Sequence, residues 1–329
     1  MTVMRARQQL YALGLLFLML LVLMEIDSLR KSVTLKEILS ISTVTLPALY
    51  PHTHTQHDSV EDMGHGVYVS APEFTVTEDT WIGGIRVDVN NAPRSVLHHV
   101  NITAVRPVAK EDELSAKERF LNAMRGIAVG QDSADAVLLP PPYAGFLPKG
   151  TRIQVTAMLH NPLPPAGPGG EYKDVSLTLH VFGVTFNPQE AKETASIFLS
   201  LADATSERGD TFTVPANTHN YIRDNKNAQD AGRGRLVFPI SGTIVGMGAH
   251  THAWQGGRQV NVFLNDQKLH SFIPRLGGGG PWDWHTDYAL IRAHVDAGDV
   301  ITLSAHYENE SSEDERGAMA QVVLTFAPD

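Results

Sequence analysis

Short stretches rich in β-branched, aromatic and alternating apolar residues recur along most of the chain, and they predict β-strands. The first series of such stretches occupies residues 66–76, 80–89, 94–105, 151–161 and 174–186. The second series occupies residues 195–201, 210–216, 234–254, 258–265, 268–274, 299–309 and 320–328. One segment with mixed charge and helical apolar spacing, "KEDELSAKERFLNAM" at 110–124, predicts a helix within the first series, between the stretches at 94–105 and 151–161.

Many short strands with little helix predict an all-β chain built from two tandem antiparallel β-sandwich domains of jelly-roll type. The turn-rich segment "NPQEAKET" at 187–194 separates the two strand series and is the best candidate for the joint. We therefore place the domains at 67–188 and 189–329. Residues 31–66, with prolines and threonines in "PALYPHTHTQHD", read as a linker that precedes them.

The N-terminal segment, residues 1–30, has the pattern of an export signal. Arg5 and Arg7 precede an apolar run from Leu10 to Met24. The sequence after this run is charged and shows no small-residue cleavage site, which favours a signal anchor over a cleaved signal peptide. We therefore expect an exported protein, either attached to a membrane with a periplasmic or extracellular domain or secreted after cleavage.

Composition excludes several classes of partner and site. The 329 residues carry a net charge of −10 and no basic run, which excludes a nucleic-acid partner. There is no cysteine, so disulfides, thiolate metal sites and cysteine nucleophiles are excluded. The chain has 15 histidines, and a bound metal would be held by imidazole, carboxylate or thioether groups.

The stretch "GMGAHTHAWQGG" places His250 and His252 on either side of one threonine, at the end of a predicted strand. Residues i and i+2 of a strand point to the same face, so the two imidazoles are well placed to hold one metal ion. Read alone, the pair is a weak signal, and ordinary surface or core histidines are the favoured explanation.

Three further features join this pair. His98 and His99 are adjacent in a predicted strand, and both reach one ion only if the strand is bulged or the rings bind through different nitrogens. His160 ends another strand of the first series, and Met319 precedes the last strand of the second. Each of these residues, taken singly, fits a structural role. Their order, with HH and H in the first series and H-x-H and M in the second, is what points to metal binding.

This order resembles the copper type II, ascorbate-dependent monooxygenases, the family of peptidylglycine α-hydroxylating monooxygenase and dopamine β-monooxygenase. The resemblance covers about residues 67–329, and the segments 210–221 and 281–311 add to it. It implies two mononuclear copper sites, which are held by His98, His99 and His160 in the first domain and by His250, His252 and Met319 in the second. It also implies that the methionine-bearing copper is catalytic. The reaction would hydroxylate a C–H bond with O₂ and electrons from ascorbate or another donor.

Two departures concern the substrate, a small molecule or a peptide that the sequence does not identify. Gly248 and Val323 stand where the peptide-processing enzyme has an arginine and a tyrosine, so peptidylglycine is not expected. A copper storage or delivery protein on the same fold is the alternative reading. A module that binds carbohydrate or a surface partner, with coincidental histidines, is a third. The linker histidines His52, His54 and His57 form either a solvated tract or a metal-loading tract.

Overall fold

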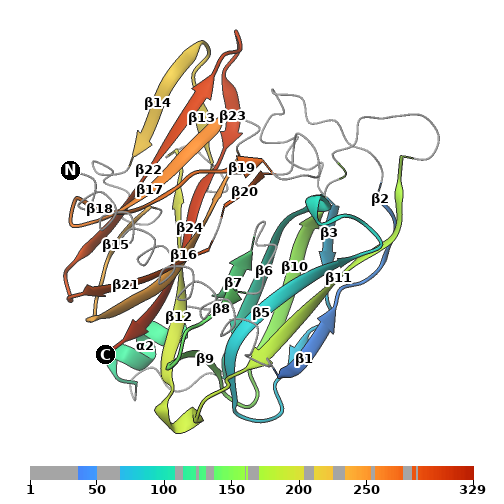
Figure 1. Cartoon of the computed structure of the whole chain (residues 1–329), viewed down its shortest axis with the longest axis vertical. Helices are drawn as coiled ribbons and strands as arrows, with labels where there is room; N and C mark the ends of the chain where they lie inside the picture. Colours follow the sequence, from blue (N-terminus) through green and yellow to red (C-terminus); the bar gives the residue numbers. More distant parts are fainter. Residues whose placement is uncertain are drawn as a thin grey trace, which may run out of the picture. The chain divides into compact units, whose positions relative to one another are not determined.

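The computed structural model describes residues 36–49, 67–107, 114–123, 126–130, 137–159, 161, 170–203, 211–224, 234–252, 256–276, 284–286 and 288–329 (Figure 1). The described residues between 37 and 329 belong to one compact unit. The export signal at 1–30, the linker histidines and His160 lie outside the described residues. None of the helices that the described residues form has the length and apolar character of a membrane span.

The described chain is nearly all β, which confirms the predicted fold class. The strands of the first series are β1 (Glu37–Ser42), β2 (Leu46–Leu49), β3 (Val67–Ser70), β4 (Phe74–Thr75), β5 (Thr80–Asn90), β6 (Leu97–Val105), β7 (Gly126–Gly130), β8 (Val137–Leu138), β9 (Tyr143–Leu147), β10 (Arg152–Leu159) and β11 (Tyr172–Gly183). Those of the second series are β12 (Lys192–Leu201), β13 (Phe212–Val214), β14 (Thr218–Asp224), β15 (Arg235–Val237), β16 (Gly242–Thr251), β17 (Gly257–Leu264), β18 (Gln267–Phe272), β19 (Arg275–Leu276), β20 (Trp284–His285), β21 (Ala289–Val295), β22 (Val300–Asn309), β23 (Glu315–Ala318) and β24 (Ala320–Pro328). Short 3₁₀ turns, η2 (Arg94–Val96) and η4 (Pro188–Glu190), precede β6 and β12.

The predicted helix is present as α2 (Ala116–Ala123), which is shorter than the sequence pattern. It begins after Ser115 because that residue and Glu118 form a capping box. The Ser115 backbone N–H donates to the Glu118 carboxylate (2.8 Å), and the Glu118 N–H donates to the Ser115 hydroxyl (3.2 Å). The helix buries Phe120 against Phe326 of β24, with ring centroids 5.5 Å apart.

The first strand series surrounds one hydrophobic core. In one group, β11 pairs antiparallel with β1 and β5, and β5 pairs with β8 and β9. In the other, β10 pairs with β3, β4 and β6, and β6 pairs with β7. Side chains that alternate along these strands fill the core, among them Val87, Val100, Ile102, Ile153, Val155, Leu177 and Leu179.

Part of the predicted linker belongs to this structure. Within residues 31–66, β1 pairs with β11 through Leu39 and Val181, and β2 pairs with it through Leu49 and Tyr172. The linker reading therefore does not hold for residues 37–49. The reason is physical, because Ile41 and Leu49 are buried at 7% and 2% exposure and add to the first core.

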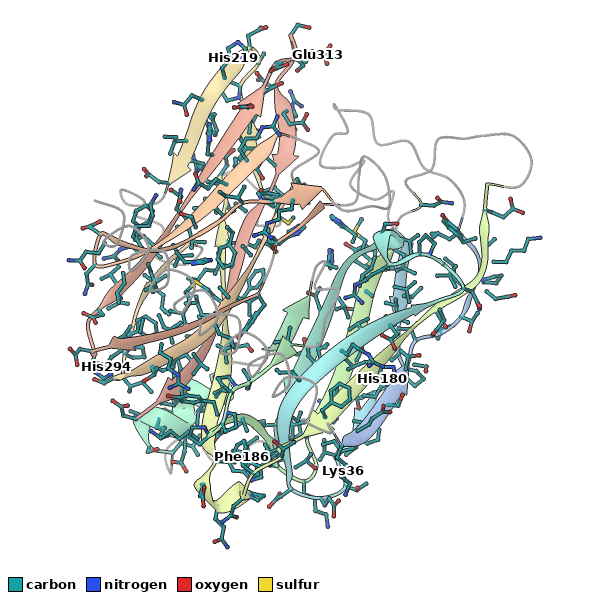
Figure 2. The ribbon with its side chains drawn as sticks, in the orientation of Figure 1. Lys36, His180, Phe186, His219, His294 and Glu313 are labelled. Carbon is teal, nitrogen blue, oxygen red and sulfur yellow. The ribbon has the colours of Figure 1, made fainter. Side chains whose placement is uncertain are left out.

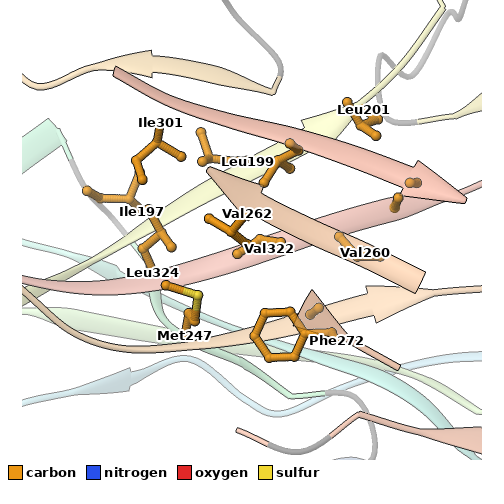
Figure 3. Packing of buried hydrophobic residues seen from close by; sticks show 14 of the residues in the cluster. Ile197, Leu199, Leu201, Met247, Val260, Val262, Phe272, Ile301, Val322 and Leu324 are labelled. Carbon is orange, nitrogen blue, oxygen red and sulfur yellow. The ribbon is translucent and has the colours of Figure 1, made fainter. Parts of the chain in front are cut away.

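The second strand series contributes its own core. Strand β24 lies between β12 and β16 with antiparallel pairing on both sides, and β16 pairs in turn with β21. A separate sheet has the order β14-β22-β17-β18. The side chains between them are shown in Figure 3 and include Ile197, Leu199, Met247, Val260, Val262, Ile301, Val322 and Leu324.

The two series share one continuous sheet. Strand β12 pairs with β24 on one side and also contacts β7 and β9 of the first series, with β9 running parallel to it. The two cores lie on either side of residues 187–194 in the sequence, apart from Phe120, which packs into the second. The domain boundary at 188/189 stays a prediction.

We expect Leu324→Ala to lower the free energy of unfolding by about 2–5 kcal/mol, because the Leu324 side chain is fully buried at the centre of the second core. Leu290→Ala is the matched control. Its side chain is 56% exposed on β21, and the cost should stay within about 0.5 kcal/mol. Urea unfolding of both variants measures the difference. Equal effects would contradict the described packing of β24.

Candidate metal centre

The H-x-H pair lies where β16 ends against the start of β24. His250 is opposite Gln321 and Thr251 is opposite Ala320 in the antiparallel register. The backbone N–H of His252 donates to the carbonyl of Met319 (3.3 Å), which continues the ladder by one residue. Because side chains alternate along a strand, His250 and His252 share one face of the sheet.

His98 reaches the same place from β6 through a break in strand pairing. His99 is opposite Met158 of β10, but Leu97 is opposite the next residue, Leu159. Strand β6 therefore has one extra residue, His98, which is the arrangement of a β-bulge. A bulge re-aims the side chains around it, and here the His98 ring is buried at 6% exposure.

Three imidazoles converge at this point. One ring nitrogen from each of His98, His250 and His252 lies within 4.8 Å of the others. The His98 ring centroid is 5.3 Å from the centroids of His250 and His252, which are 5.1 Å from each other. All three side chains are buried. Imidazoles so arranged fit the first ligand shell of a copper or zinc ion.

The electrostatics of the cluster favour neutral rings. Burial lowers the pKa of His250 well below its usual range, and the nearby His252 and His99 rings lower it further. Burial also lowers the pKa of His99 to about 4. Neither ring nitrogen of His250 has a hydrogen-bond partner among the described residues. A buried polar group without a partner costs free energy, and coordination to a metal would remove that cost.

A buried hydroxyl network holds the ends of β16 and β24 in register. The Tyr307 hydroxyl on β22 donates to the carbonyl of Met319, and the hydroxyl of Thr251 donates to Tyr307 across 2.7 Å. The hydroxyl of Thr286 donates to the carbonyl of Ala249 on β16. These contacts fix the backbone on both sides of His250. Tyr307 carries no functional signal in the sequence, because the alternation of Leu303, Ala305 and Tyr307 in "LSAHYEN" is only that of core residues.

The structure combines the predicted ligands differently from the two-centre arrangement that the family resemblance implies. His98, of the first series, is almost as close to His250 and His252 as to its neighbour His99, at 5.3 Å against 5.1 Å between ring centroids. The His99 ring is farther from His250, at 6.4 Å. A separate centre with His160 stays a prediction, because His160 lies outside the described residues.

Met319 is buried at 7% exposure directly before β24. Its backbone lies opposite His252, and opposed residues of an antiparallel pair project to the same face. The methionine side chain thus belongs to the face that carries His250 and His252. That placement agrees with the predicted thioether ligand, and ligation itself stays a prediction.

We expect His250→Leu to remove one equivalent of bound copper or zinc while leaving the metal-free protein as stable as before, or about 1 kcal/mol more stable. The reason is that it deletes a buried ring whose nitrogens have no hydrogen-bond partner in the described part of the chain. His294→Leu is the control, since its side chain is 58% exposed on β21 (Figure 2) and His294 is opposite Thr243, seven residues from His250 along β16. Metal analysis after dialysis, with urea unfolding in chelator, measures both quantities. Unchanged metal content in His250→Leu would exclude this centre.

We expect Tyr307→Phe to destabilise the protein by about 1–3 kcal/mol, because Thr251 and the Met319 carbonyl lose a buried partner. It should also weaken metal affinity by about 10–100-fold, as the loss of groups that orient ligands does. Tyr221→Phe is the control, because the Tyr221 ring also contacts Phe212. It should change neither the stability nor the metal affinity. Calorimetric metal titration measures the affinity, and urea unfolding measures the stability. Wild-type metal affinity in Tyr307→Phe would show that the hydroxyl network does not orient the ligands.

Comparisons with known proteins identify no family for the chain. No family model matches it, and no curated protein matches it. Among solved structures, that of PNGF-II in space group P21 is similar to this chain with a TM-score of 0.32 and 11% identity. The match covers 87% of this chain and 65% of that one. "Recombinant peptide: N-glycanase F (PNGase F)" has a TM-score of 0.31 and 10% identity, over 87% and 95%. A T=1 particle derived from infectious bursal virus has a TM-score of 0.23 and 8% identity, over 89% and 71%.

Proposed function

We propose that this protein is a copper-dependent monooxygenase whose buried centre contains His98, His250 and His252. The observation that carries the proposal is the convergence of three buried imidazoles, with both ring nitrogens of His250 lacking a partner among the described residues. The donor set fits copper, because imidazole suits both of its oxidation states and thioether favours Cu(I). Zinc fits the imidazoles equally well, and Met319 is the residue that favours copper.

Bound copper would supply electron transfer and the activation of O₂. The protein's own contribution is to hold neutral imidazoles ready to bind and to keep bulk water from them. Burial maintains the neutral form, and the backbone network around Tyr307 and Thr251 fixes their positions. The reaction we propose is hydroxylation of a substrate C–H bond, with ascorbate or another donor supplying electrons.

A copper storage or delivery protein is the second candidate. The buried position of His250 and His252, at 6% and 1% exposure, favours it, since a site without solvent access holds a metal securely. Export and membrane attachment remain proposals that rest on the pattern of residues 1–30.

The test is ascorbate-dependent O₂ uptake by the copper-loaded full chain. We expect uptake in the wild type and a loss of at least about tenfold in Met319→Ile, because the soft ligand that favours Cu(I) is gone. The apolar volume is kept, so stability should fall by only about 1 kcal/mol. Copper content should remain, since the three histidines are unchanged.

Met247→Ile is the matched control. Met247 is also a buried methionine, on β16 itself, but it points into the second core on the opposite face (Figure 3). It should retain wild-type uptake. Copper binding without uptake in the wild type would favour storage over catalysis. Full uptake in Met319→Ile would overturn the role given to its sulfur.

A further inference from the structure

A pocket opens beside the metal centre. Its empty volume is about 800 Å³, with open solvent at its mouth included. One wall is the β12–β24–β16 face, with Ser196, Val323, Thr325 and Gly248. Another part of the lining comes from β5, β8 and β9 and the residues beside them and is apolar, with Ile82, Leu139 and Phe146 among its residues.

The pocket and the metal centre lie along the same face of the same two strands. Gly248 lines the pocket and is two residues before His250 on β16. Val323 lines it as well and is two residues after Gln321, the residue opposite His250 on β24. Two residues of a strand span about 7 Å, so a molecule in the pocket lies next to the histidines.

Arg106 is the one charged residue among those that line the pocket, and it is already ion-paired. Arg106 is paired with Glu193 at 2.6 Å and also donates to the carbonyl of Phe146 at 2.8 Å. The Tyr288 hydroxyl lies 2.7 Å from the Thr325 hydroxyl. Burial raises the pKa of Tyr288 to about 12, so its hydroxyl stays protonated at neutral pH. The lining thus offers hydroxyl groups for a hydrogen bond and apolar surface for the rest of a ligand.

We propose that this pocket binds an uncharged, largely apolar small molecule and presents it to the metal centre, with the Tyr288–Thr325 hydroxyl pair as its polar anchor. An anionic ligand would lose its hydration and meet only Arg106, whose charge Glu193 already neutralises, which is costly in a buried site. The statement that this molecule is a substrate rests on the proposed function. Binding of the molecule requires only the pocket.

Two glycines on different strands allow the pocket to be filled from two parts of its lining. A Cβ added at Gly248 would have the Tyr288 ring as its nearest neighbour at 3.4 Å, and one added at Gly145 on β9 would lie 3.9 Å from Ile82. Neither position has the positive φ that would strain a larger residue. The series Gly248→Ala and Gly248→Val, with Gly145→Val on β9, therefore reduces the volume in steps while leaving all three histidines in place.

The experiment uses N-phenyl-1-naphthylamine, an uncharged fluorescent probe, and 1-anilinonaphthalene-8-sulfonate, which has the same rings with an added sulfonate. We expect the uncharged probe to bind in one equivalent and the sulfonate at least about tenfold more weakly. Gly248→Val and Gly145→Val should each weaken the uncharged probe by at least about tenfold, with Gly248→Ala in between and copper content unchanged. Adding Cu(II) should quench the bound probe in the wild type and not in His250→Leu.

The outcomes separate the pocket from the function. Probe binding that both valine variants reduce supports the pocket, even if no O₂ uptake is found. Equal affinity for both probes, or full affinity in both valine variants, overturns the proposal while leaving the metal centre intact. Strong probe binding without Cu(II) quenching in a copper-loaded wild type overturns the proposed proximity to the metal.

Discussion

The alternation of side chains along β24 is the constraint on which the rest of the site depends. All nine residues of this strand are buried between β12 and β16. Val322, Leu324 and Phe326 point into the second core, while Val323 and Thr325 line the pocket on the other face. Strand β16 repeats the division, with Met247 in the core and Gly248 at the pocket. A slip of one residue would turn both faces over and bury the histidines in the apolar core.

The buried histidine cluster costs the metal-free protein folding free energy, and this cost is evidence that the cluster has a function. Burial of several imidazoles in one place lowers the pKa of His250, and its ring nitrogens have no partner among the described residues to offset the cost. The surrounding backbone keeps the cluster in place, since the Tyr307 hydroxyl is hydrogen-bonded to both the Thr251 hydroxyl and the Met319 carbonyl. Such a local cost, supported by a rigid frame, is typical of functional sites.

The sequence predicted those parts of the fold that depend on local pattern. The strand series, the helix around Phe120 and the shared face of His250 and His252 all follow from periodicity, and the structure has them. The strands at 37–49 were missed because a short edge segment carries few periodic residues, and its burial depends on β11. The convergence of His98 with His250 was missed because spacing does not show which distant strands become neighbours.

The central claim is that His98 of the first strand series and the H-x-H pair of the second hold the same ion. Anomalous diffraction at the copper edge, on crystals of the copper-loaded full chain, tests it most directly. The account predicts one buried peak at bonding distance from His98, His250 and His252 together. Two separate peaks, one on His98 with His99 and the other on His250 with His252, would contradict it.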